Sequence, residues 1–170
     1  MSEYFKYLKR TILFCFTVVL TNLITLCACQ KGYLSFMEQF TARTATGVLH
    51  FFGFSAAQNN TFIHLKTAVL VVNPECTAVF IMVIFSCLVA FHQTSAVSKI
   101  AAILVGLPVI FAVNLIRFII MALLDQYRPL YLTYFPSYLW QGTLLVMAVF
   151  MWMAWMTAVG KRETKAALNA

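Results

Sequence analysis

Four long apolar runs separated by polar segments dominate the pattern of the chain. They cover about residues 11–29, 77–92, 99–124 and 138–158. Each run is long enough, or nearly so, to cross a bilayer core about 30 Å thick as a helix. The pattern therefore predicts one all-α integral membrane domain over residues 1–170, built as a bundle of about four transmembrane helices.

The segment 30–76, between the first two runs, has a different pattern. Its apolar residues recur at loosely helical spacing and alternate with polar ones, which predicts an amphipathic helix that lies at the membrane surface or packs shallowly into the bundle. Gly53 is expected to end this helix. Asn59-Asn60 predicts a turn, and the β-branched stretch 61–72 predicts a short extended element leading to Cys76. The apolar residues with helical spacing are Leu34, Met37, Phe40, Val48, Phe51 and Phe52.

Composition and charge turn this pattern into a membrane topology. Hydrophobic residues make up 62% of the 170 residues and charged residues only 10%, which excludes an ordinary soluble domain. The net charge of +7 does not indicate nucleic acid, because basic residues gather in short segments beside the runs. Such segments face the cytoplasm. We therefore expect both termini on the cytoplasmic side of a cell membrane, and segments 30–76 and 125–137 on its outer side. The basic residues of these segments are Lys6, Lys9, Arg10, Lys99, Lys161, Arg162 and Lys165.

The first run also has features of a cleaved signal. A basic start, an apolar middle and the sequence Leu26-Cys27-Ala28-Cys29 are similar to a lipoprotein signal and its cleavage box. The length of the run favours a first membrane span instead.

Two residues need a functional explanation: a cysteine at the membrane surface and an arginine inside an apolar run. A charged residue within a span costs about 2.5–3.5 kcal/mol on insertion scales and usually has a function. Cys76 lies at the outer end of the second run, and Arg117 lies about 18 residues, or roughly 27 Å of helix, along the third. Asn114 shares the helical face of Arg117, and Tyr138 begins the fourth run. Topology therefore predicts that Cys76, Asn114, Arg117 and Tyr138 lie in one outer layer.

This set of residues suits acyl transfer. A thiolate attacks carbonyl carbon, and a neighbouring cation favours the thiolate or neutralises a developing oxyanion. Arg117 cannot act as a general base, because a guanidinium does not deprotonate in proteins. Two other interpretations remain open: a disulfide from Cys76 to Cys27 or Cys29, and an Arg117 side chain that extends outward to lipid phosphates.

The same residues resemble the motifs of a known family. The run VVNPECT at 71–77 is similar to the Cys-Ser/Thr-Gly signature of the exosortase/archaeosortase family, and NLIR at 114–117 is similar to its Asn-x-x-Arg motif. An upstream pattern, from TA at 41–42 to LHFFGF at 49–54, also resembles the family. The resemblance covers about residues 35–155.

The resemblance implies a membrane cysteine transpeptidase. Members cleave a C-terminal sorting signal of exported proteins, which consists of a short motif, a hydrophobic span and a basic tail. Cys76 would then be the nucleophile that forms a thioester, and Arg117 would support the thiolate or the oxyanion. Asn114 and Glu75 are expected to be supporting residues, and no cofactor or metal is implied.

The chain departs from the family pattern at two positions. Ala78 stands where the signature has glycine, and Tyr138, in the frame Tyr138-x-x-x-Gly142, stands where the family has histidine or, in archaeal members, arginine. Tyrosine donates a hydrogen bond but is a poor base at a pKa near 10. His50 and His64 are expected on the outer side, and His64, in the extended element before Cys76, is the better candidate for a substitute base. The alternatives to an enzyme are a catalytically inactive membrane assembly or secretion subunit, and a transporter subunit in which Arg117 binds an anion.

Overall fold

The computed structural model describes residues 2–127 and 137–168, with the side chains of residues 8–9, 11–127 and 140–161. Helices make up most of the chain, and a small sheet and a 3-10 helix lie between the second and third of them. The helices are α1 (Ser2–Gln30), α2 (Ser35–Phe51), α3 (Val79–Phe91), α4 (Ala96–Tyr127) and α6 (Ser137–Leu168), and the 3-10 helix is η1 (Pro74–Thr77). The strands are β1 (Ala57–Asn59), β2 (Phe62–His64) and β3 (Val69–Val71).

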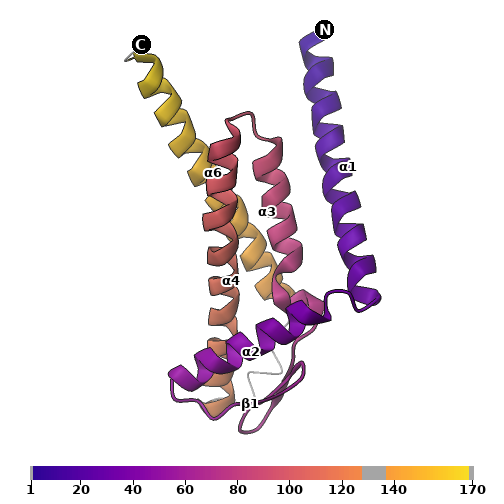
Figure 1. Ribbon diagram of the computed structural model, residues 1–170, viewed down its shortest axis with the longest axis vertical. Coiled ribbons are helices and arrows are strands. Elements are labelled where there is room, and N and C mark those ends of the chain that lie inside the picture. Colours follow the sequence, from indigo (N-terminus) through magenta and orange to yellow (C-terminus); the bar gives the residue numbers. More distant parts are fainter. Residues whose placement is uncertain (1, 128–136, 169–170) are drawn as a thin grey trace.

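The helices divide into an up-and-down set and one crosswise helix (Figure 1). Helices α1, α3, α4 and α6 run along the long axis of the molecule, and α2 lies across one end with the sheet beyond it. Both termini and the connection between α3 and α4 lie at the opposite end. Segment 30–76 and the two termini are therefore at opposite ends of the bundle.

The all-α membrane fold is confirmed, with one helix shorter than the others. Three helices in the described part of the chain are long and apolar enough to cross a membrane, namely Thr11–Gln30, Ala96–Tyr127 and Trp140–Lys161. Helix α3 is apolar but has only 13 residues, or roughly 20 Å at 1.5 Å per residue. It is shorter than the predicted run 77–92 because Ala78 adopts a left-handed conformation, with φ 60° and ψ 7°, and separates η1 from α3.

The predicted amphipathic helix is confirmed as α2, and its inward face consists mainly of small residues. The phenylalanines predicted for its apolar face are exposed, Phe40 at 46% and Phe51 at 86%, whereas Met37 and Val48 of that face are half-buried. This distribution suits a helix whose large side chains contact lipid and whose small ones allow close packing on the protein. Gly53, at φ 82°, follows the end of the helix as expected. The buried residues of α2 are Thr41, Ala42, Ala45, Thr46 and Leu49.

The predicted extended element is confirmed and is larger than expected, because it forms an antiparallel sheet in the order β1-β2-β3. Asn60, at φ 53°, makes the predicted turn between β1 and β2. The loop between β2 and β3 is attached to the end of α4, since Asp125 accepts hydrogen bonds from the Thr67 backbone N–H (3.1 Å) and from its hydroxyl.

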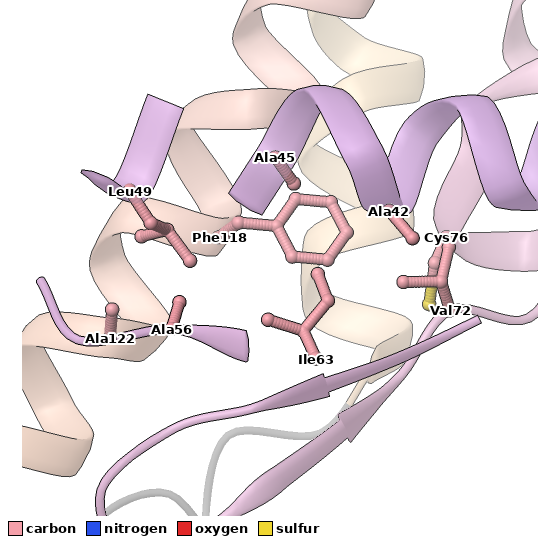
Figure 2. Packing of buried hydrophobic residues seen from close by; sticks show 9 residues of the cluster. All are labelled: Ala42, Ala45, Leu49, Ala56, Ile63, Val72, Cys76, Phe118 and Ala122. Carbon is pink, nitrogen blue, oxygen red and sulfur yellow. The ribbon is translucent and has the colours of Figure 1, made fainter. Parts of the chain in front are cut away.

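Two apolar clusters form the interior. The sheet-side core joins α2, the sheet, η1 and α4, and Figure 2 shows the Phe118 ring between Ala45 of α2 and Ile63 of β2. The bundle core joins α3, α4 and α6. The sheet-side core consists of Ala42, Ala45, Leu49, Ala56, Ile63, Val72, Cys76, Phe118 and Ala122. The bundle core consists of Ala78, Ile81, Phe85, Val89, Ala102, Ile110, Leu144 and Ala148.

Candidate functional site

One face of α4 carries the polar residues of the candidate site. Its buried residues recur every three or four positions, which is the spacing of a single helical face. Asn114 (fully buried) and Arg117 (4% exposed) lie on this face, between Ile110 of the bundle core and Phe118 of the sheet-side core. Arg117 is therefore buried in the protein and does not extend outward to lipid. The buried residues of α4 are Ala102, Gly106, Ile110, Asn114, Arg117, Phe118, Ala122 and Asp125.

Cys76 lies in η1 and is connected directly to this face. The Asn114 side-chain N–H donates to the Cys76 carbonyl at 2.6 Å. Cys76 as a residue is 8% exposed, and its Sγ lies 3.8 Å from the Val71 carbonyl, to which it donates. The predicted association of Cys76 with Asn114 is present in the structure. All five cysteines are free, so the alternative disulfide is not formed.

The two residues after Cys76 shape the turn that carries the thiol. The Thr77 hydroxyl donates to the Pro74 carbonyl at 2.6 Å and accepts from the Val79 N–H at 3.4 Å, so it holds both sides of the turn. Ala78 is in the left-handed region, where a Cβ costs roughly 1–2 kcal/mol and glycine is at ease. This conformation gives a physical reason for a Cys-Ser/Thr-Gly signature at this turn.

Three buried polar side-chain atoms of α2 and α4 have no hydrogen-bond partner among the described residues. They are Oδ1 of Asn114, Nε of Arg117 and the Thr41 hydroxyl. Buried polar groups are normally bonded, and each unsatisfied one costs about 1–3 kcal/mol. Thr41 belongs to α2, which packs against η1. An amide oxygen, a guanidinium nitrogen and a hydroxyl on the two helices that pack against η1 are thus buried without a partner among the described residues.

Glu75 links η1 to the last helix. Its carboxylate accepts a hydrogen bond from the Gln141 side chain of α6 at 3.3 Å. Tyr138 belongs to the first turn of the same helix, and its side chain lies outside the described residues. The structure therefore brings α6 to the turn of Cys76, while the role of Tyr138 stays a prediction.

The described contacts of the three histidines are with other parts of the chain than this turn. His64 is exposed on β2 and lines an open pocket of about 900 Å³ together with His50, Lys66 and Asp125, and Cys76 is not part of its lining. His92 follows the end of α3, and its ring lies 5.3 Å from that of Trp155. None of the hydrogen bonds described for this chain joins a histidine to Cys76. The proposal of His64 as a substitute base gains no support from these contacts.

Thr41 and Gln141 were missed as site residues by sequence reasoning. Thr41 was part of the upstream pattern that resembles the family but was given no role in the site, and its complete burial depends on α2 packing against η1. Gln141 is a polar residue near the start of an apolar run, just before Gly142. That position is the one sequence signal that could have indicated it.

The fold is an all-α membrane bundle with a crosswise surface helix, and it contains a buried thiol and a buried guanidinium. Together these features define a class of polytopic membrane proteins with a candidate thiol site at one end. The family model of transmembrane exosortases (Exosortase_EpsH) matches residues 2–155. The chain therefore belongs to the transmembrane exosortase family, as its motifs indicated. Searches of curated proteins and of solved structures found no match to the chain.

Proposed function

We propose that the chain is a membrane cysteine transpeptidase or protease that cleaves a C-terminal sorting signal of exported proteins through a thioester on Cys76. The hydrogen bond from Asn114 to the Cys76 carbonyl carries the proposal. It attaches the turn that bears the thiol to the face of α4 that bears Arg117, within one helical turn of that arginine. Family membership supports the same reaction class.

The reaction uses Cys76 as nucleophile and Arg117 as electrostatic support. The thiolate attacks the scissile carbonyl, a carbon–sulfur bond forms, and the oxyanion of the tetrahedral intermediate lies near the guanidinium. The carbon–nitrogen bond then breaks, and the amine leaves with the proton that the thiol gave up. An amine or water attacks the thioester and restores the thiol.

A base has to carry that proton from the thiol to the leaving amine. Tyr138, a poor base but both a hydrogen-bond donor and acceptor, stands in the family's third position, and we propose that its hydroxyl completes the site from α6 by relaying this proton. The contact between Glu75 and Gln141 supports this assignment, because it holds the start of α6 against η1.

The proposed substrate is an exported protein with a C-terminal hydrophobic span and a basic tail, bound from the lipid bilayer. The site faces outward and both termini face the cytoplasm of a cell membrane. The basic residues around both termini support this orientation, and α2, with its exposed phenylalanines, would then lie in the outer interface.

Replacement of the nucleophile tests the proposal. In cells that express the chain naturally, Cys76→Ser should abolish processing, so that precursors with an intact C-terminal span accumulate in the membrane. Quantitative mass spectrometry of C-terminal peptides measures that accumulation. Cys87→Ser is the matched control, since Cys87 is also buried but lies in the middle of α3, and it should process normally. Unchanged processing in Cys76→Ser would refute the enzyme proposal.

A second candidate function is an inactive relative that acts as a membrane assembly or secretion subunit. The observation that favours it is the absence of any described hydrogen bond between a histidine and Cys76, combined with tyrosine in the third position. Such a subunit would keep its cellular function in the Cys76→Ser variant and lose it only when α2 or the sheet is disrupted.

A further inference from the structure

Strand β3 forms one edge of the sheet, and the register shows which of its backbone groups face outward. Val72 N–H donates to the Thr61 carbonyl and Leu65 N–H to the Ala68 carbonyl. Hydrogen-bonded pairs alternate with non-bonded ones in an antiparallel ladder, so the pairs that involve Val69 and Val71 are non-bonded. The N–H and C=O groups of Val69 and Val71 therefore point away from β2.

This outward edge leads to the thiol. The Val71 carbonyl, which points away from β2, is the acceptor for Cys76 Sγ at 3.8 Å. Among the described residues, no backbone hydrogen bond satisfies the Val69 or Val71 N–H. Their side chains are 50% and 46% exposed. Among the described residues, the edge thus presents backbone N–H donors that no strand uses, and its Val71 carbonyl contacts the Cys76 thiol.

We infer that β3 binds the substrate as an added strand. The segment just before the C-terminal span of an exported protein pairs with Val69 and Val71, and this pairing brings its scissile carbonyl to Cys76 Sγ. An exposed edge strand is a template for an extended peptide, because main-chain hydrogen bonds give affinity whatever the sequence. The inference rests on the proposed function and adds to it the binding mode of the substrate.

The position of the sheet fits this occupant. The sheet lies beyond α2, at the end of the bundle opposite the termini (Figure 1). A substrate span lying in the bilayer beside the bundle would place the segment that leaves the membrane at this end. Val69 and Val71 present apolar side chains to such a segment, and cross-strand apolar pairs stabilise a sheet.

Proline substitution removes one backbone donor and so tests the pairing. Val69→Pro loses an N–H that the sheet itself does not use, and proline is tolerated at such edge positions. Loss of one hydrogen bond should lower the processing rate roughly three- to tenfold. The matched control is Gln58→Pro on the opposite edge, because the register of β1 with β2 leaves the Gln58 N–H pointing outward as well. Gln58→Pro should process at the rate of the unmodified protein.

The outcomes separate this inference from the proposed function. If Cys76→Ser blocks processing and Val69→Pro processes as fast as Gln58→Pro at equal membrane levels, strand addition is refuted while the enzyme stands. If Cys76→Ser itself processes normally, the proposed function fails first.

A cross-linking measurement covers the case in which Val69→Pro does not accumulate in the membrane. The photoreactive p-benzoylphenylalanine replaces Val69 or, as control, Gln58 in the Cys76→Ser chain, and cross-linked peptides are mapped by mass spectrometry. The probe at position 69 should attach to the segment directly before a precursor's C-terminal span, at least about fivefold more than the probe at position 58. Equal yields at the two positions, or attachment elsewhere in the precursor, would overturn the inference.

Discussion

The two cores of the molecule differ in what their packing accomplishes. In the bundle core, large side chains fill the space between α3, α4 and α6, and Gly106 approaches the Phe85 ring so closely that a Cβ would overlap it. The sheet-side core packs small residues of α2 around Phe118 and adjoins the layer of Cys76, Asn114 and Arg117. Packing in the first region maximises contact, whereas packing in the second holds polar groups in place.

The presence of buried polar atoms without a hydrogen-bond partner does not by itself distinguish the two cores. The indole N–H groups of Trp140 and Trp152, beside the bundle core, also have no partner among the described residues. In the described part of the chain, the sheet-side end combines such atoms with a charged group and a thiol, whereas the bundle core does not. The sheet-side end therefore differs from the bundle core in the kinds of group it holds, which are a thiol, a guanidinium and an amide.

Arg117→Met should have the largest effect on processing. A small effect would remove the functional difference between the two cores. Removal of one donor to an oxyanion typically costs about 10²–10³ in rate, so processing should fall by that factor. Thermal stability should hold or rise, because burial of a charge opposes folding and Nε of Arg117 has no partner among the described residues. Processing and the melting temperature of the detergent-solubilised protein provide the two readouts.

Ile110→Val is the control on the same face of α4. It removes one methylene from the bundle core and should cost about 0.5–1.5 kcal/mol of stability without changing processing by the folded protein. If Arg117→Met behaved like Ile110→Val, Arg117 would be a structural residue and the distinction between the two regions would fail.

Gly106→Ala should destabilise the bundle core by about 1–3 kcal/mol, because the new methyl group forces the Phe85 ring to move. Gly142→Ala, where a Cβ meets no atom within 4 Å, should be neutral or slightly stabilising in its helix. Thermal denaturation in detergent measures both. A Gly106→Ala protein as stable as Gly142→Ala would contradict the close packing assigned to this core.

Ala78→Gly should have a smaller effect on stability than Gly106→Ala, and it tests the strain in the turn between the two cores. Glycine relieves the left-handed strain at φ 60°, so stability should increase by about 1 kcal/mol and processing should be retained. The same substitution at Ala122, which is buried in α4, should destabilise by roughly that amount. A loss of stability in Ala78→Gly would show that the methyl group, at 2% exposure, contributes more by packing than it costs in strain.

The sequence predicted the elements better than their contacts. Continuous apolar runs indicated the membrane helices, and Gly53, Asn60 and the β-branched stretch before Cys76 indicated local features that the structure has. The strand β1 and the left-handed break at Ala78, which separates η1 from α3, were not predicted. Both depend on the tertiary arrangement, since β1 (Ala57–Asn59) has no β-branched residue and Ala78 is not an intrinsic helix breaker.

Sequence reasoning could predict those candidate-site residues whose depth in the membrane follows from charge and topology. Arg117 and Asn114 share a face by their spacing, and Cys76 was assigned to the same layer from the direction of the helices. Thr41 and Gln141 could not be found in this way, because their relation to η1 depends on how α2 and α6 pack against it. Whether Tyr138 completes the site stays a prediction.

Trapping of the acyl-enzyme tests the central claim most directly. Membranes that contain the protein and its precursors are quenched in acid, and the peptide bearing Cys76 is analysed by mass spectrometry with and without hydroxylamine. The account predicts a hydroxylamine-labile acyl adduct on Cys76 that ends at the cleavage point of the precursor. Ongoing precursor cleavage with no adduct on Cys76, or with the adduct on another cysteine, would contradict it.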